Sequence, residues 1–324
     1  MIKEERVLDM SDVGLGNLNE YRLLVMLGSY HSQCLVKDLD ITPNDIVDNN
    51  DRMLYPAYYM TNLKVPITNF IEDYKLWDRV KFFVDINKFG SNILDSSYRF
   101  EKVNSSENGQ DQPAITMTSN SLFVVDATID KSVSRTVSIP KKTCITGLPK
   151  ISKAPSSLAE FKNIRRNIYN LGKSAIIAPK YQYKVCTNRD VSPNHGVIFA
   201  KFIEIMDICE REFLCSSDNL GLSEQLTDYI HVLERETYYY SNCFANDVIE
   251  VQMKMDFEEC KERNLTGSKQ EVTPYLIHIV FELYNQQTHN LVAIAKAKKI
   301  ICLPIVCLDY EMDINRLIIK KYYE

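Results

Sequence analysis

A short stretch in the second half of the chain, N-R-D-V-S-P-N-H-G, gathers residue types that can do chemistry. It places Asp190, Asn194, His195 and Gly196 directly before a segment with helical periodicity. Free N–H groups at a helix start can stabilise an oxyanion, and glycine lets a substrate carbonyl approach the backbone. Asp190 could act there as a general base or nucleophile. The competing interpretation is structural, with Asp190 and Asn194 capping a turn and the helix.

Three tyrosines, Tyr55, Tyr58 and Tyr59, form a second candidate within M-L-Y-P-A-Y-Y-M-T-N-L-K-V. In a half-buried strand, tyrosines usually pack, while their hydroxyls reach water or a backbone partner. A nucleophilic phenol is rarer, because its pKa of ~10 keeps it protonated near neutral pH unless it is activated.

His31, in G-S-Y-H, is a third candidate, since an imidazole titrates near neutral pH. A lone histidine on a helix is more often a satisfied core or interface side chain. The five histidines show no HExxH or HxxxH spacing, and the nine cysteines show no CxxC pair. The sequence therefore predicts no metal site and no bound cofactor.

Two segments with a period of 3.6 residues must position these groups. Residues 18–36 predict an amphipathic helix, with Asn17 as its possible N-cap and Glu20 as the capping partner. Residues 197–215 predict a second long helix. Its apolar face contains Phe199, Phe202, Ile203, Met206, Cys209 and Phe213.

Each helix is followed by segments that alternate as antiparallel strands do. They are residues 53–65, 77–103 and 121–130 in the first half, and 236–244, 247–257, 275–285 and 291–303 in the second. The repeated order suggests duplication of one α+β unit, in which a helix packs on an antiparallel sheet.

Polar, irregular segments punctuate the chain. Residues 103–120 predict a long exposed connection, and residues 140–179 contain a basic helical stretch and the expected domain boundary. We therefore divide the chain into an N-terminal domain, 1–150, and a C-terminal domain, 151–324. The run from Lys296 to Lys299 predicts a solvated strand edge, with contact to the phosphates of CoA or a carrier arm as the alternative.

Composition excludes several classes of protein. The 324 residues are 45% hydrophobic and 25% charged, which is enough for a sizeable core. The net charge of −5 has both signs interspersed, which argues against nucleic acid and anionic membrane as partners. The charged N-terminus, the absence of a span of ~18 apolar residues and the scattered cysteines predict a cytoplasmic protein with reduced thiols. The missing P-loop, GxGxxG and GxSxG motifs disfavour nucleotide kinases, Rossmann dehydrogenases and α/β-hydrolases.

The order of the motifs resembles a known family. G-L-G-N-L-N-E-Y-R-L-L-V-M-L-G-S-Y-H, R-M-L-Y-P-A-Y-Y, L-W-D-R-V and R-D-V-S-P-N-H-G-V-I-F-A-K-F follow one another over most of the chain. This order is similar to that of the double hot-dog proteins of polyketide and nonribosomal peptide biosynthesis clusters, the LnmK-type acyltransferase/decarboxylase family or a sister branch. The resemblance implies an α+β fold of two tandem hot-dog units, each a long helix wrapped by an antiparallel sheet.

The resemblance also implies where acyl thioesters bind. Hot-dog enzymes hold thioesters of CoA or acyl carrier protein near the start of the central helix, often beside an Asp and an Asn-His-Gly type of turn. Asp190, Asn194 and His195 match that pattern as catalytic residues, with Gly196 and Val197 as substrate-binding residues.

In the LnmK type, a tyrosine is acylated by methylmalonyl-CoA, the acyl group loses carbon dioxide, and propionyl passes to the carrier's phosphopantetheine thiol. By its position, Tyr55 resembles that nucleophile, and Tyr59 is the second choice and a possible substrate-binding residue.

Three functions remain open on the sequence. The first is an acyltransferase, possibly also a decarboxylase, with Tyr55 as nucleophile and His31 as orienting group or base. The second is a thioesterase or dehydratase in which Asp190 activates water or His195 moves a proton. The third is a binding module without catalysis. The expected partners are acyl-CoA and acyl carrier protein, and the chain is expected to be a monomer or homodimer.

Overall fold

The computed structural model describes residues 2–14, 16–103, 113–125, 137–141, 145–164, 175–192, 196–259 and 275–302. The first half of the chain forms one long helix and five strands. In chain order they are β1 (Ile2–Val7), α1 (Glu20–Leu39), β2 (Leu54–Lys64), β3 (Arg79–Phe89), β4 (Ile93–Lys102) and β5 (Ile115–Val125), with the short 3-10 helices η1 (Pro43–Asp45) and η2 (Ile71–Asp73) between them.

The second half repeats this order of a long helix followed by strands. Its elements are α2 (Ser157–Ile164), β6 (Ile176–Ile177), β7 (Tyr181–Lys184), α3 (Phe199–Cys215), α4 (Glu224–Thr227), β8 (Ile230–Tyr239), β9 (Val248–Glu259), β10 (Tyr275–Asn285) and β11 (Leu291–Ile301). The sequence therefore predicts both long helices and most of the long strands, whereas the strands predicted at 121–130 and 236–244 begin earlier, at Ile115 and Ile230.

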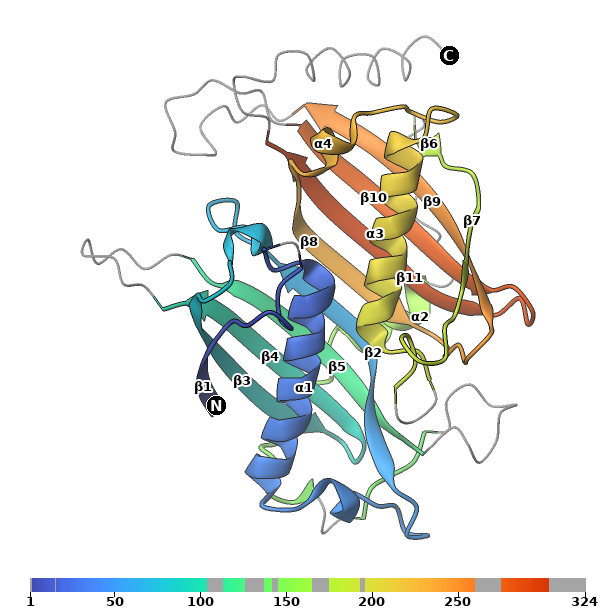
Figure 1. Cartoon of the computed structure of the whole chain (residues 1–324). Helices are drawn as coiled ribbons and strands as arrows, with labels where there is room; N and C mark the ends of the chain where they lie inside the picture. The colour runs from blue at the N-terminus through green and yellow to red at the C-terminus, as the bar shows by residue number, and fades with distance from the viewer. Residues whose placement is uncertain are drawn as a thin grey trace.

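All of these strands belong to one antiparallel sheet of 11 strands (Figure 1). Its two halves meet where β2 pairs with β8. Outward from this junction, the order is β2-β5-β4-β3 on one side and β8-β11-β10-β9 on the other. β1 pairs with β3, and β7 pairs with β9. The strand order is thus the same in both directions from the junction.

The turns of the two halves share the same backbone hydrogen bonds. The residue after β1 bonds to the residue before β3, and the residue after β7 bonds in the same way to the residue before β9. In each half, the loop before the long helix also bonds to the chain four residues upstream of that acceptor. The bonds are Leu8 N–H to Asp78 O (2.9 Å), Leu18 N–H to Tyr74 O (2.8 Å), Val185 N–H to Asp247 O (2.9 Å) and Val197 N–H to Cys243 O (2.9 Å).

The two long helices lie side by side on one face of the sheet (Figure 1). They run in opposite directions, because Gly28 of α1 meets Phe199 at the start of α3, while Glu20 at the start of α1 shares Arg235 with Asp207, farther along α3. The main hydrophobic core fills the space between the helices and the sheet. α2 covers the opposite face of the sheet, where Phe161 packs on Tyr59 and Tyr238.

Three local predictions are wrong. The N-cap of α1 is Asn19, whose side chain accepts from Arg22 N–H, and not Asn17. The connection predicted over 103–120 ends early, because β5 already begins at Ile115. Lys296 to Lys299 does not lie at a strand edge, because β11 is paired on both sides, with β10 and β8. The domain division at residue 150 stays a prediction.

Candidate active site

The loop before α3 is held by a fully buried carboxylate, that of Asp190. β7 ends six residues before it, and the Ile198 N–H donates to the Asp190 backbone carbonyl at 3.0 Å. Ser192 N–H donates to Gly196 O at 2.9 Å, which closes the loop. The backbone of this loop is therefore folded back on itself directly before the first turn of α3.

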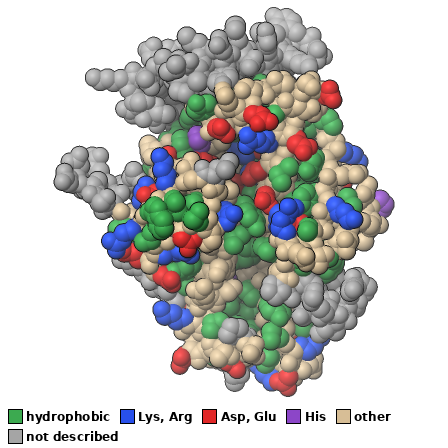
Figure 2. Space-filling view, viewed as in Figure 1, with side chains coloured by type: hydrophobic (Ala, Val, Ile, Leu, Met, Phe, Trp, Pro, Cys, Tyr) green, Lys and Arg blue, Asp and Glu red, His purple; other side chains and the backbone are tan. Residues whose placement is uncertain are grey.

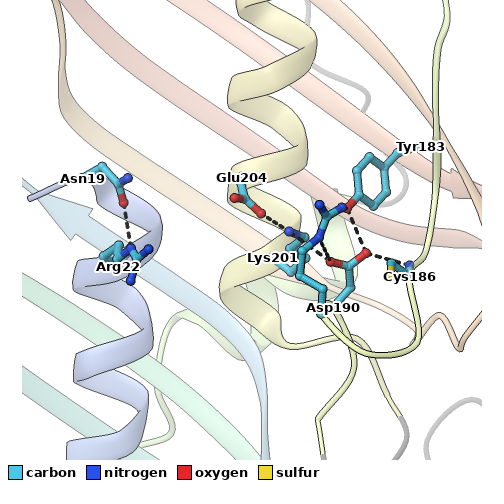
Figure 3. Close-up of polar contacts among 8 residues, drawn as sticks. Asn19, Arg22, Tyr183, Cys186, Asp190, Lys201 and Glu204 are labelled. Carbon is cyan, nitrogen blue, oxygen red and sulfur yellow. Dashed lines mark hydrogen bonds and ion pairs between the residues drawn. The ribbon is translucent and has the colours of Figure 1, made fainter. Parts of the chain in front are cut away.

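Four donors surround the Asp190 carboxylate (Figure 3). Oδ2 accepts from the Tyr183 hydroxyl at 2.8 Å and from the Cys186 N–H at 2.7 Å. Oδ1 pairs with Arg189 Nε and Lys201 Nζ, each at 3.0 Å. Both oxygens are thus occupied by strong partners.

These partners decide the charge of Asp190. Burial by itself would raise the pKa of the carboxyl, but the Cys186 N–H, the Tyr183 hydroxyl, Lys201 and Arg189 together hold the pKa below its usual range. The pKa of Lys201 is raised, because its pairing with Glu204 and Asp190 outweighs its burial. Asp190 is consequently an ionised group with occupied oxygens, which suits positioning the loop better than abstracting a proton.

The two long helices begin differently. The N-cap of α1 is Asn19, whose side chain occupies the Arg22 N–H at 2.9 Å (Figure 3). The N-cap of α3 is Ile198, whose side chain carries no acceptor. Among the described residues, no side chain caps the first N–H groups of α3, and free N–H groups at a helix start can stabilise an oxyanion.

The predicted residues of this loop are only partly visible. Gly196 and Val197 are buried beside Asp190, and Val197 N–H bonds to Cys243 O. Asn194 and His195 lie outside the described residues. The structural interpretation of Asp190 also finds support, since its bond to the Cys186 N–H caps a turn.

His31 lies on the buried side of α1, fully enclosed. Its Nδ1 is joined to the Tyr98 hydroxyl at 2.7 Å, and its ring lies 5.5 Å from that of Tyr58. Burial lowers the pKa of His31 to about 4, so the imidazole is neutral at neutral pH. Tyr58 in turn packs on Phe199, which places His31 beneath the start of α3.

The two candidate nucleophilic tyrosines lie elsewhere. Tyr55, near the start of β2, donates its hydroxyl to Met53 Sδ at 3.0 Å. Tyr59 faces α2 on the opposite side of the sheet from α1 and α3, with its hydroxyl 3.5 Å from Ser157 Oγ. A thioether does not accept a proton as a base would, so this contact with Met53 does not activate the phenol as a nucleophile.

Sequence reasoning missed Lys201, Tyr183 and Arg189, which complete the Asp190 cluster. The sequence contains a signal for Lys201, because this lysine stands within the apolar run of the second helix. In the structure it is only 2% exposed. A buried lysine needs an anionic partner, and Asp190 was already a candidate.

A second buried cluster joins the two halves. Arg235 Nε pairs with Glu20 Oε1, and its Nη2 pairs with Asp207 Oδ1, each at 2.7 Å. Lys299 pairs with Asp207 at 3.2 Å and with Glu210 at 2.6 Å. Glu20, Asp207, Glu210 and Lys299 of this cluster line a cavity of about 310 Å³ between the start of α1 and α3. On the surface of this face, acidic and basic side chains are interspersed (Figure 2).

Several further features bear on the class of protein. Cys34, Cys186, Cys209, Cys215, Cys243 and Cys302 are free thiols. Within the described ranges, no three metal-binding side chains converge on one point. In the same part of the chain, none of the helices has the length and apolar character needed to span a bilayer.

Neither a protein-family model nor a curated protein sequence matches the chain. Among solved structures, it is similar to a putative oleoyl thioesterase from Lactobacillus plantarum, with a TM-score of 0.61 and 9% identity over 93% of this chain and 96% of that one. It is also similar to a 12:0-ACP thioesterase from Umbellularia californica, with a TM-score of 0.57 and 12% identity over 92% and 93% of the chains. An acyl-ACP thioesterase from Bacteroides thetaiotaomicron gives a TM-score of 0.53 at 11% identity over 92% and 96%.

These similarities show the fold. The chain has a large antiparallel sheet with few helices, as hot-dog thioesterases do. The expectation of a hot-dog fold is therefore confirmed at this level, whereas membership of the LnmK-type family finds no support among these structures.

Proposed function

We propose that this chain is a thioesterase built of two tandem hot-dog units, which hydrolyses acyl thioesters of CoA or acyl carrier protein at the start of α3. The observation that carries the proposal is the start of α3, which no side chain of the described residues caps, beside the loop segment that the ionised Asp190 holds. The similarity to three solved thioesterases over more than nine-tenths of the chain supports the same reaction class.

In the proposed reaction, water attacks the thioester carbonyl carbon and the carbonyl oxygen becomes an oxyanion. The first backbone N–H groups of α3, from Phe199 onward, stabilise this charge. The C–S bond then breaks, so that a carboxylic acid and a free thiol are released. His195 takes the proton from water and returns it to the departing sulfur, in the role that the sequence predicts for it.

Asp190 is a positioning residue in this mechanism. Its four partners tie the segment just before His195 in the sequence to β7 and to the first turn of α3. An asparagine at this position would retain the size of the side chain but lose the charge that Lys201 and Arg189 pair with.

The test is release of thiol from acyl-CoA and acyl carrier protein, measured for wild type, Asp190→Asn and His195→Ala. We expect kcat/KM to fall by roughly 10²–10⁴-fold for His195→Ala, the range of general acid–base catalysis, and substantially for Asp190→Asn. Asp12→Asn is the matched control, because Asp12 is also buried before a long helix and accepts the Asp9 N–H at 3.0 Å.

The same experiment separates hydrolysis from acyl transfer through Tyr55. Hydrolysis at α3 predicts that Tyr55→Phe retains turnover and that no acyl group stays on the protein. A covalent acyl adduct on the intact protein that disappears in Tyr55→Phe would contradict the proposal and establish the acyltransferase route. If the acyl group also loses carbon dioxide, the adduct is lighter by about 44 Da.

A further inference from the structure

Phe199, the first residue of α3, fills the space directly behind the proposed site. Its ring centroid lies 4.4 Å from that of Tyr58 and 6.3 Å from that of Tyr239. On its other side is Gly28 of α1, where a Cβ atom would come within 2.7 Å of Phe199 Cε1. The ring is thus wedged between α1 and the sheet, at the point where α1 has no side chain.

A polar cluster lies beneath this ring. Tyr98, on β4, joins it through one hydroxyl, which is 2.7 Å from His31 Nδ1, 3.0 Å from Ser119 Oγ and 3.4 Å from the Tyr58 hydroxyl. These four side chains come from α1, β4, β5 and β2, and all are buried. The floor under Phe199 therefore contains hydroxyls and an imidazole.

One atom of this floor lacks a partner. His31 is 0% exposed, and its Nε2 has no hydrogen bond to any described residue. A buried polar atom left unsatisfied costs roughly 1–3 kcal/mol, so such atoms in native proteins usually bind a ligand or an ordered water. The neutral imidazole can serve either as donor or as acceptor at this position.

Small hydroxyl side chains extend the floor across the sheet. Thr61 of β2 stands opposite Ser119 of β5 and Thr237 of β8. All three are at most 3% exposed, and the Thr61 hydroxyl lies 3.3 Å from that of Tyr239. A plain alkyl chain pushed past Phe199 would meet this polar surface and strip it of hydrogen bonds, which is unfavourable.

From this arrangement, and resting on the proposed function, we infer that Phe199 limits the site to short acyl groups, and that the His31–Tyr98 floor binds a hydroxyl or carbonyl group of the acyl chain. Phe199 is then a specificity-determining residue, and His31 a substrate-binding one. The preferred substrate class is a short hydroxyacyl or oxoacyl thioester, in contrast to the oleoyl and 12:0 groups named for two similar structures.

The experiment compares butyryl-, 3-hydroxybutyryl-, octanoyl- and dodecanoyl-CoA by thiol release. For wild type, we expect kcat/KM to be highest for the hydroxylated C4 substrate and lowest for dodecanoyl-CoA. Phe199→Ala should raise the octanoyl-to-butyryl ratio at least ~10-fold, because the longer chain can then fill the space that the ring leaves above the floor, and each methylene accommodated changes discrimination by roughly tenfold or more. His31→Leu should bring the 3-hydroxybutyryl-to-butyryl ratio close to one.

The outcomes separate this inference from the proposed function. Turnover that favours dodecanoyl-CoA in wild type, or an unchanged chain-length ratio in Phe199→Ala, overturns the inference and leaves the thioesterase intact. If Phe199→Ala does not fold, Phe199→Leu provides the same comparison with a smaller change.

If wild type hydrolyses none of the four acyl groups, presented either on CoA or on acyl carrier protein, the proposed function fails. The inference is then decided by binding, through the shift in melting temperature that each thioester causes. The inference is supported if 3-hydroxybutyryl-CoA raises the melting temperature more than butyryl-CoA does and if His31→Leu removes this difference. Equal shifts with the two thioesters overturn the inference.

Discussion

His31 and Asp190 are both fully buried, yet the chain treats their charges in opposite ways. Asp190 has four donors and is held ionised, whereas His31 has one hydroxyl neighbour and is held neutral. The difference follows from partners, because burial alone disfavours the charged form of either group. At these two positions, charge is therefore retained where cations and N–H donors stand next to it and suppressed where the hydrogen-bond partner is a hydroxyl.

The neutral state of His31 gives a pH dependence of stability. Its folded pKa of about 4 lies below the ~6.5 of an unfolded histidine, so between these values the unfolded chain binds the extra proton. The stability that the neutral His31 contributes is fully present above the unfolded pKa of ~6.5 and is lost as the pH falls towards the folded pKa of about 4. From pH 7.5 to pH 5, the contribution lost is about 2 kcal/mol.

Urea unfolding at pH 7.5 and pH 5.0 measures this loss in wild type and His31→Leu. We expect the variant to lose about 2 kcal/mol less than wild type between the two pH values. His289→Leu serves as control for removing a histidine. Equal losses in wild type and His31→Leu would show that His31 is not buried neutral.

At this scale, the sequence identifies some site residues and not others. Asp190 stands out because a carboxylate, a proline and a glycine precede a periodic segment. Tyr183 and Lys201 do not, because their contact with Asp190 depends on β7 pairing with β9 and on the way α3 returns to it. The neutral floor around His31 likewise joins residues 67 and 88 positions apart, which no local pattern encodes.

The contact between α1 and α3 depends on charge as well as packing. Arg235 is 1% exposed and bridges Glu20 of α1 and Asp207 of α3. Burial raises the pKa of Glu20, while Lys299 and Arg235 outweigh the burial of Asp207 and lower its pKa. One guanidinium thus ties the start of the first long helix to the second.

Removing that guanidinium should be costly. We expect Arg235→Met to lower the free energy of unfolding by about 3–5 kcal/mol, because it leaves the buried Glu20 carboxylate without its partner and Asp207 with Lys299 alone. Arg79→Met is the matched control, since Arg79 pairs with Glu5 on the surface and such pairs contribute about 0–1 kcal/mol. Urea unfolding at neutral pH gives both values, and a similar small loss for the two variants would exclude the bridging role.

Elements with strong periodicity are predicted well, and their neighbours are not. The apolar stripes of α1 and α3 and the alternation of β3, β4 and β10 follow from local pattern. The abundance of Ser, Asn, Gly and Gln over residues 103–120 predicts a connection, although Ser119 and Asn120 are buried in the sheet as part of β5. Local pattern also places Lys299 at a strand edge, because the pairing partners on both sides of a strand are long-range in sequence.

At the scale of the whole molecule, the β2–β8 junction makes one sheet out of two halves. Met60 to Lys64 of β2 pair with β8, and the Arg235 cluster bridges the helices above the same junction. Hydrogen bonds and buried ion pairs that cross between the halves couple their unfolding. The molecule should therefore unfold as one cooperative unit.

The single tryptophan allows a direct check. Trp77 lies in the first half, just before β3, and is 68% exposed. We expect its fluorescence and the far-ultraviolet circular dichroism of the whole chain to change at the same urea midpoint. A fluorescence midpoint clearly below the dichroism midpoint would mean that the first half unfolds alone.

The repeated turns give this molecule an internal reference for experiments. Trp77 and Asn246 hold the same position before β3 and β9, with φ of 73° and 70°, and Asp78 and Asp247 follow them with the same bonds. A substitution in one half can thus be read against its twin in the other, within one polypeptide and one preparation. An effect that both twin substitutions cause reports on the stability of the fold. A loss of activity that only the substitution in the second half causes reports on the proposed site.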